Sequence, residues 1–264
     1  MNAASLPAPA APPMRADLKL AAVLGVAAAF ATAALFPYLQ LLMPEQLAKL
    51  PVSLPVLVLA QSLQALLLLG LLAFCGLRMG HAIGLGAPWL RACLAKAPRA
   101  AQPWWLAAAC GAAAALVVLG LDPLFASSMP APLHALPAQP AGTHALAGFL
   151  ASFYGGIAEE IQLRLFLVTL LAWGMSRFRA GGVADWQLLL AVLLAAIAFG
   201  AGHLPAAGKV WPLDTVVVVR TVLLSAIAGL VFGWFYIRHG LESAMLSHFC
   251  ADLVLHVAAP LAMA

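Results

Sequence analysis

Apolar residues fill seven long stretches of the chain, and shorter segments that carry most of its charges separate them. The stretches cover residues 20–44, 50–77, 102–121, 144–173, 186–203, 216–237 and 241–259. A helix that crosses a membrane needs roughly 20 predominantly apolar residues, so each stretch is long enough to cross once. The pattern therefore predicts an all-α, polytopic membrane helix bundle with about seven transmembrane helices.

The composition agrees with a membrane protein and excludes an ordinary soluble domain. Of the 264 residues, 65% are hydrophobic and 8% are charged, whereas soluble domains carry about 25% charged residues. The formal net charge is +4, but no basic cluster is interleaved with aromatic residues, so no nucleic-acid partner is expected. The cysteines have neither the spacing of a metal site nor that of a disulfide framework; they are Cys75, Cys93, Cys110 and Cys250.

The distribution of Lys and Arg between the connecting segments predicts the orientation. The outer segments hold only Lys49 and Lys209 if the N-terminus is cytoplasmic. The inner segments then hold Arg15, Lys19, Arg78, Arg91, Lys96, Arg99, Arg177, Arg179 and Arg238. This bias follows the positive-inside rule. We therefore expect the N-terminus inside, the C-terminus outside, and an integral, multi-pass protein of the cell (inner or plasma) membrane.

Three parts are expected along the chain. Residues 1–18 start with a run rich in Pro and Ala, which is typical of a disordered N-terminal tail. Residues 19–143 hold three transmembrane helices, with a basic cytoplasmic loop at 78–101 and an irregular outer loop at 122–143. Residues 144–264 hold the other four helices. The first apolar stretch also fits a signal peptide, but its length favours a retained helix.

Three charges interrupt the fourth apolar stretch, where a charged side chain must face protein or water rather than lipid. Glu160 and Arg164 are four residues apart on a helix, which favours an ion pair. Glu159 lies about 100° from Glu160 around a helix of 3.6 residues per turn. Arg164 therefore neutralises Glu159 less than it neutralises Glu160. Such a partly desolvated carboxylate can act as a general base. The alternative is a buried ion network without chemistry.

Two histidines end the list of candidate residues in the apolar stretches. His203 closes the fifth stretch after Phe199 and two glycines, where a simple helix-end histidine is the alternative interpretation. His248 and Asp252 are four residues apart on the seventh stretch, so one face presents both side chains. Such a pair binds a metal, fixes an imidazole tautomer, or only stabilises the helix.

At these residues the chain resembles the CPBP intramembrane proteases, a family that includes CAAX prenyl endopeptidases and bacteriocin-processing and self-immunity proteins. The family motifs EExxxR, FxxxH and HxxxN match Glu159, Glu160 and Arg164, then Phe199 and His203, then His248. The resemblance covers about residues 145–256 and implies that residues 144–264 are a catalytic core. One position departs from the family, because Asp252 stands where Asn is common. An ionised Asp cannot donate a hydrogen bond to an oxyanion, so Asp252 is protonated, orients His248 or helps to hold a cation.

The resemblance implies an endopeptidase that hydrolyses a peptide bond of a membrane-associated substrate, of CAAX type or a peptide precursor, within the lipid bilayer. In the favoured interpretation Glu159 activates water, Glu160 and Arg164 fix their helix, and the histidines assist without a cofactor. In a zinc version, His203, His248 and a carboxylate bind Zn²⁺ and leave one position for water. The other function classes are a non-catalytic membrane scaffold or immunity protein, and a proton-coupled transporter.

Simple helix geometry does not bring the two histidines to one level. At a rise of 1.5 Å per residue, His203 lies about 25 Å from the inner end of its helix, and His248 lies about 10 Å from the inner end of its own. Tilted or displaced helices are needed if both belong to one site. Arg220, near the outer end of the sixth stretch, is expected to reach the outer interface.

Overall fold

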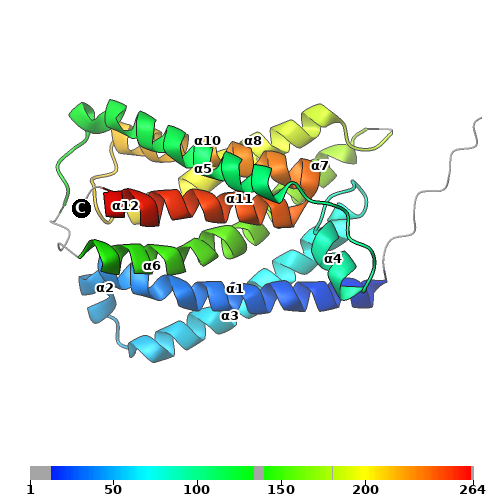
Figure 1. The fold of residues 1–264 in the computed structure, drawn as a ribbon, viewed down its shortest axis with the longest axis horizontal. Coiled ribbons are helices and arrows are strands. Elements are labelled where there is room, and N and C mark those ends of the chain that lie inside the picture. Colours follow the sequence, from blue (N-terminus) through cyan, green and yellow to red (C-terminus); the bar gives the residue numbers. More distant parts are fainter. Residues whose placement is uncertain (1–12, 134–139, 180, 263–264) are drawn as a thin grey trace, which may run out of the picture.

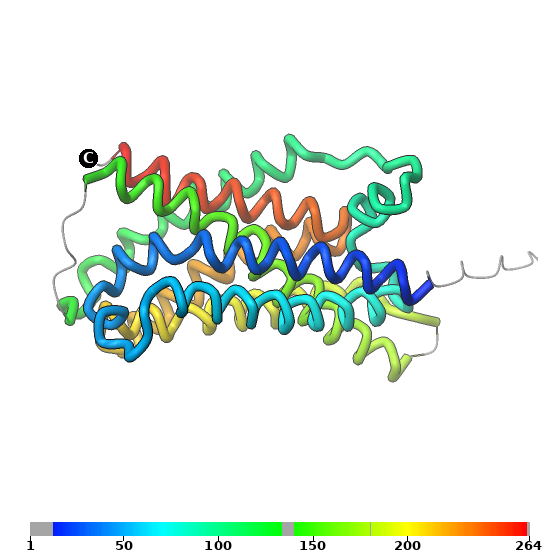
Figure 2. Tube along the Cα trace, turned by 90° about the horizontal axis from the view of Figure 1, so that it is seen from below, coloured from blue at the N-terminus to red at the C-terminus, as the bar shows by residue number. Residues whose placement is uncertain are grey.

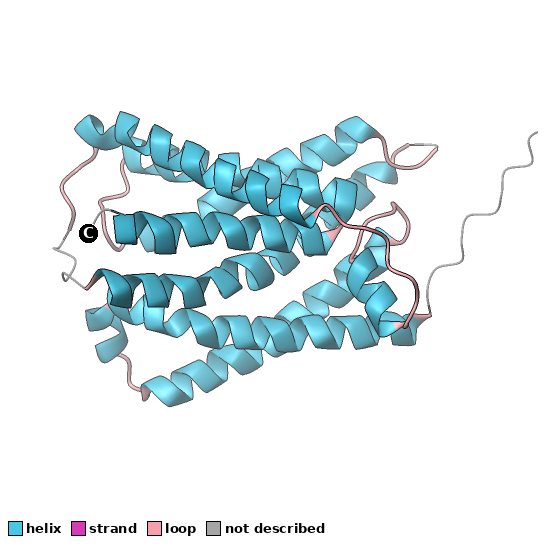
Figure 3. Cartoon of the chain, in the orientation of Figure 1, coloured by secondary structure: helices cyan, strands magenta, loops and turns pink. Residues whose placement is uncertain are grey.

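The computed structural model describes residues 13–133, 140–179 and 181–262, and in this part of the chain all regular structure is helical (Figures 1 and 3). The first half contains α1 (Met14–Leu42), α2 (Pro44–Ala48), α3 (Leu54–Gly80), α4 (Pro88–Leu94), α5 (Trp104–Leu121) and the 3₁₀ segment η1 (Asp122–Ser128). The second half contains α6 (Ala141–Phe153), the π-helical segments η2 (Tyr154–Glu159) and η3 (Ile161–Val168), α7 (Thr169–Ser176), α8 (Asp185–Gly202), α9 (Leu204–Ala207), α10 (Thr215–His239), α11 (Leu241–Leu253), the π-helical η4 (Val254–Ala258) and α12 (Ala259–Ala262).

The predicted all-α membrane bundle is confirmed. Within the described residues, six helical segments are long and apolar enough to cross a membrane, beginning at Met14, Leu54, Trp104, Asp185, Thr215 and Leu241. The fourth predicted stretch is one further helical run, because α6, η2, η3 and α7 follow one another from residue 141 to residue 176. With seven crossing segments, the start of α1 and the end of α12 lie at opposite ends of the bundle, as Figure 1 shows. The protein is therefore an integral, multi-pass membrane protein.

Helix α11 lies inside the bundle and contacts α5, α6, α10 and η2. Figure 2 shows α1 and α3 side by side along another face of the bundle. Large apolar side chains such as Leu59, Leu63 and Leu67 of α3 are exposed, which suits a surface in contact with lipid rather than water. The interior holds small residues together with buried polar groups, and Glu160, Arg164 and His248 are among those groups.

A buried ion cluster joins α1, α3 and α4 at one end of the bundle. Asp17 of α1 is fully buried and accepts hydrogen bonds from Arg78 of α3 at 3.0 Å and from Arg91 of α4 at 2.6 Å. The ring of His81 lies 2.9 Å from the same carboxylate. The predicted tail of residues 1–18 is therefore wrong for its last residues, because α1 begins at Met14 and Asp17 anchors its first turn. Residues 1–12 lie outside the described part.

The basic loop at 78–101 contains the short helix α4, which packs onto the start of α11. The buried carboxylate of Glu242 accepts a hydrogen bond from the backbone N–H of Leu90 at 2.7 Å. The N–H of Leu241 donates to the carbonyl oxygen of Gly86 at 3.0 Å. Gly240 makes the tight connection between α10 and α11 with φ of 94°, a conformation that favours glycine. The start of α11 is thus covered by α4 and by the loop before it.

The outer loop is less irregular than predicted. Its first residues form η1, and Asp122 of η1 makes an ion pair of 2.5 Å with Arg220 of α10. Arg220 also lies over the ring of Trp211. Arg220, which was expected to reach the outer interface, is therefore paired with Asp122 within the protein. Residues 134–139 of this loop lie outside the described part.

Replacement of Asp17 by Asn should lower the free energy of unfolding by about 1 to 3 kcal/mol, because it removes a buried partner of charged groups. Thermal unfolding of the purified protein in detergent measures this effect. Glu45→Gln is the matched control, because Glu45 is 82% exposed and pairs only loosely with Lys49. Equal unfolding of both variants and the wild type would contradict an anchoring role for Asp17.

Candidate functional site

The fourth membrane-crossing run changes its helical geometry where its charges lie. Residues 154–159 and 161–168 form π-helical turns between the α-helices α6 and α7. π-Helical turns are rare and are found frequently at functional sites. Gly155 and Gly156 belong to the first of these turns, and both face α11 without a side chain between the helices. The local geometry therefore presents Glu159, Glu160 and Arg164 to the centre of the bundle.

Glu160 and Arg164 form the predicted ion pair in the interior. The Nη1 atom of Arg164 lies 2.9 Å from Oε1 of Glu160, and their side chains are 1% and 0% exposed. Arg164 also donates through Nη2 to the carbonyl oxygen of Gly229 on α10 at 3.0 Å. Its guanidinium lies over the rings of Phe199 and Phe232, 5.1 and 5.3 Å from their centroids. The pair thus ties the fourth run to α8 and α10.

Glu160 also orients His248. The Nδ1 atom of His248 lies 2.7 Å from Oε1 of Glu160, and since that carboxylate is paired with Arg164, Nδ1 carries the donated proton. The imidazole stacks on Phe232 with ring centroids 4.3 Å apart, and Phe199 packs against it edge-on at 5.4 Å. Contacts from three elements hold the ring in one orientation, with its Nε2 atom pointing away from Glu160.

Two more carboxylates lie next to this Nε2 atom. Oε2 of Glu159 is 3.7 Å away, and Oδ1 of Asp252 is 3.6 Å away. Their side chains are 21% and 13% exposed, so this is the more open side of the cluster. Arg164 pairs with Glu160 and not with Glu159, which agrees with the expectation that Glu159 is the less neutralised carboxylate.

Gly155 makes the approach of Asp252 possible. A Cβ atom on Gly155 would collide with Oδ2 of Asp252 and lie 3.0 Å from Nε2 of His248. The space for the open side of the cluster therefore depends on the missing side chain. In the sequence, Gly155 is one residue of an ordinary predicted helix. Only its contact with α11 shows that it leaves room for Asp252 and His248.

His203 is next to the cluster but not in direct contact with its carboxylates. It follows the last residue of α8, and its Nδ1 atom donates to the carbonyl oxygen of Phe199 at 2.8 Å. Its ring packs edge-on against Phe199, with centroids 4.7 Å apart. Because Phe199 touches both imidazoles, His203 and His248 lie at similar levels. The buried start of α11 beneath α4 accounts for the difference that simple helix lengths predicted.

The zinc version of the site does not fit this arrangement. Among the described residues, no three His, Cys, Asp or Glu side chains are placed to hold one metal ion. His203 and His248 each pack edge-on against the ring of Phe199, and the Nδ1 atoms of both are already used, by the Phe199 carbonyl and by Glu160. No chemical step is therefore assigned to a bound metal.

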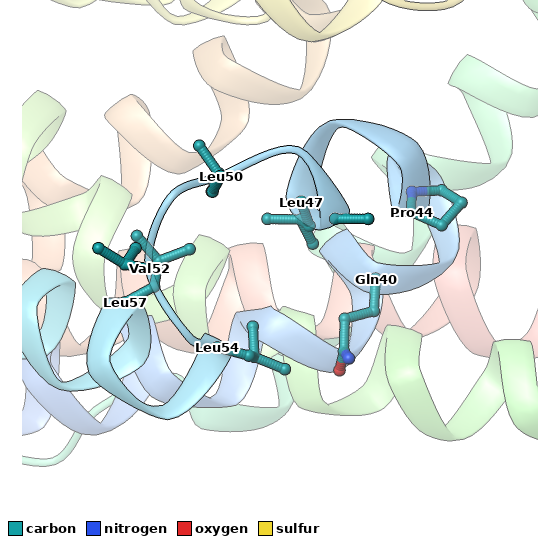
Figure 4. Close-up of a pocket in the computed structure, with 8 residues that line it drawn as sticks. Gln40, Pro44, Leu47, Leu50, Val52, Leu54 and Leu57 are labelled. Atoms are coloured by element: carbon teal, nitrogen blue, oxygen red, sulfur yellow. The ribbon is translucent and has the colours of Figure 1, made fainter.

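Neither of two hollows in the structure contains the cluster. One of about 370 Å³ lies between the end of α1, α2 and the start of α3, and Figure 4 shows its mainly aliphatic lining, including Leu47, Leu54 and Leu57. A groove of about 500 Å³ runs between α5 and α10, lined by apolar residues such as Val117 and Trp234. The chemistry-bearing side chains lie instead in the packed centre of the bundle.

Some residues of the site were not identified from the sequence as its parts. Phe232 stacks on His248, and the carbonyl of Gly229 accepts a hydrogen bond from Arg164. Tyr38 contacts His256, with 3.4 Å between the hydroxyl and Nδ1, and its ring also packs against His144. No short-range sequence pattern predicts this second polar group, because Tyr38, His144 and His256 come from α1, α6 and η4.

Part of the chain matches a family model. The model described as "Type II CAAX prenyl endopeptidase Rce1-like" matches residues 141–254. This segment contains Glu159, Glu160, Arg164, His203, His248 and Asp252. No curated protein and no solved structure matches the chain. The resemblance to the CPBP proteases is confirmed over this segment, and the match supports an intramembrane endopeptidase of the CAAX type in general.

Removal of Arg164 should leave Glu160 as an uncompensated buried charge. We expect Arg164→Met to lower the free energy of unfolding by about 3 to 5 kcal/mol, and a second change, Glu160→Gln, to recover part of the loss because the buried charge is gone. Thermal unfolding of both variants in detergent checks this, with Arg179→Met on the exposed loop after α7 as the control. A double variant less stable than Arg164→Met would contradict the proposed pairing.

Proposed function

We propose that this protein is a glutamate-type intramembrane endopeptidase in which Glu159 activates the attacking water. The observation that carries the proposal is the meeting of Glu159, an oriented His248 and Asp252 around one Nε2 atom inside a bundle of membrane helices. Charged groups at this depth are expensive, and function is the usual reason for their presence. The family match over residues 141–254 supports the same conclusion.

Glu159 is the best general base of the group. It is the most exposed carboxylate of the cluster and is not neutralised by Arg164, whose partner is Glu160. A water hydrogen-bonded to Glu159 would lose its proton to the carboxylate as its oxygen attacks the peptide carbonyl. The attack forms the C–O bond and places negative charge on the former carbonyl oxygen.

His248 would stabilise this developing charge. Its ring is fixed by Glu160 and Phe232, and its Nε2 faces the open side, so in the imidazolium form it would donate a hydrogen bond to the oxyanion. Glu160 and Arg164 act through His248 as positioning residues. His203, whose Nδ1 is used by a backbone carbonyl, keeps Nε2 as an acceptor and would orient the water.

The substrate class follows from the surroundings of the site. A bundle that crosses the bilayer admits a membrane-associated protein or peptide, and the family name favours a substrate with a CAAX-type or precursor-type sequence. No cofactor is needed for the steps above. We place the activity in the cell (inner or plasma) membrane, with the N-terminus of the chain inside.

The decisive variant is Glu159→Gln, which removes the charge with little change in shape. We expect new protein termini in membranes of cells that carry the wild type, and a decrease of about 10²- to 10⁴-fold in their rate of formation in the variant. Mass spectrometry of membrane-protein termini measures both. Glu45→Gln, which removes an exposed carboxylate at the end of the bundle, should behave as the wild type.

Identical termini in wild-type and Glu159→Gln membranes, with equal amounts of folded protein, would overturn the protease. Glu159-dependent proton uptake into liposomes would then favour a proton-coupled transporter, and its absence a non-catalytic scaffold or immunity protein.

A further inference from the structure

Asp252 is the carboxylate whose task the reaction above does not assign. Asp252 follows His248 by about one turn of α11, and its carboxylate lies near Nε2 of His248. Glu159 approaches the same atom from η2. Three roles are available to it: orientation of His248, participation in a cation site, or donation of a proton. The contacts of the cluster separate these roles.

Orientation of His248 is already achieved by other groups. Glu160 holds Nδ1 at 2.7 Å, within hydrogen-bond distance, and Phe232 stacks on the ring. Asp252 is 3.6 Å from Nε2, which is beyond a hydrogen bond of good geometry. The second role also lacks support, because within the described residues no set of three His, Cys, Asp or Glu side chains is arranged to hold a cation.

The charges of the cluster favour the third role. Ionised Glu159, Glu160 and Asp252 face two cationic groups, Arg164 and an imidazolium at His248. One additional proton makes this buried group neutral, and burial of an uncompensated charge is costly. Glu160 is compensated by Arg164 at 2.9 Å and by His248 at 2.7 Å, whereas within the described residues the nearest nitrogen to the Asp252 carboxyl is Nε2 of His248, 3.6 Å away and beyond a good hydrogen bond. Glu159 is placed similarly, but its side chain is 21% exposed and that of Asp252 only 13%, so an ionised Asp252 is the more poorly solvated of the two. Asp252 is thus the carboxyl best suited to hold the proton.

The surroundings of Asp252 on other elements agree with this assignment. Tyr38 of α1 is close enough to interact electrostatically with it, but the phenol contacts the His256 ring rather than Asp252. The Gly155 backbone faces Oδ2 without a polar side chain. The carboxyl is 13% exposed, so it can reach a bound substrate beside Glu159.

We propose that Asp252 is the catalytic acid that protonates the leaving amine. The inference rests on the proposed function. Water gives one proton to Glu159 while its oxygen bonds to the carbonyl carbon; the C–N bond then breaks, and the amine nitrogen takes the proton of Asp252. A proton passes from Glu159 to Asp252 to restore the resting state, and the new carboxyl gives its own proton to the amine or to water. One water is consumed, and a carboxylate and an ammonium are formed.

The test compares an amide with an ester at the same bond. The substrate is a synthetic peptide that spans a terminus whose formation requires Glu159, made also with an ester in place of the scissile amide. Without protonation, the ester expels an alkoxide, whereas the amide would have to expel the far more basic anion of an amine. The ester therefore depends less on a proton donor. Asp252→Asn should therefore lower hydrolysis of the amide by about 10²- to 10⁴-fold and that of the ester far less. Glu159→Gln should abolish both.

Cys250→Ser is the control, because Cys250 lies on the same helix and two residues away, on another face. It should hydrolyse both substrates as the wild type does. A purely structural role of Asp252 would lower hydrolysis of amide and ester equally, and that result would overturn the inference. Wild-type activity of Asp252→Asn on the amide would also overturn it, while Glu159-dependent cleavage would still support the protease.

Infrared spectroscopy of the protein in lipid bilayers tests the proton without any substrate. A carboxylic-acid C=O band at neutral pH that disappears in Asp252→Asn and persists in Cys250→Ser supports the inference. Absence of such a difference overturns it. If no cleavage depends on Glu159, the proposed function fails and the catalytic role of Asp252 fails with it.

Discussion

The buried ion pair between Glu160 and Arg164 is the interaction on which the rest of the site depends. Neither side chain is accessible to solvent, so each charge must be satisfied by the other and by neighbouring helices. Arg164 reaches the Gly229 carbonyl on α10 and lies against Phe199 of α8. Glu160 reaches His248 on α11. One pair thus fixes how four helices meet, and the partner that it orients is the imidazole of the proposed reaction.

The second constraint is the level of α11 in the bundle. Its first turn is held to α4 through Glu242 and to the loop before α4 through Leu241, and α4 is attached to α1 and α3 through Asp17. This chain of contacts links the basic inner loop to the helix that carries His248 and Asp252. These contacts fix the position of α11 along the bundle, and with it the contact of His248 with Phe199.

The open side of the cluster combines a base and an acid around one imidazole. Glu159 and Asp252 come from different elements and lie at nearly equal distances from Nε2 of His248. Glu160 and Arg164 compensate each other and add little to the net charge. The charges that are not compensated in this way belong to Glu159 and Asp252, which lie where a peptide bond would bind in the proposed reaction. The rings of Phe199 and Phe232 pack against the imidazole between them.

The sequence by itself determined the elements and the local pairs. Runs of apolar residues predict membrane helices because lipid leaves no other partner for the backbone, and a separation of four residues placed Glu160 beside Arg164 and His248 beside Asp252. The motifs also singled out His203. For the two pairs the information is local, since helical periodicity alone relates the residues, whereas His203 is assigned to the site by the resemblance to the family.

Only the tertiary structure decided which helices meet and at what level. The burial of Asp17, the pairing of Arg220 with Asp122, and the shared contact of His203 and His248 with Phe199 join residues far apart in the chain. The π-helical turns and the close approach at Gly155 arise where α11 packs against the fourth run. Such contacts depend on the packing of the whole bundle, because the partners of Asp17 and Asp122 come from other helices and not from their neighbours in sequence.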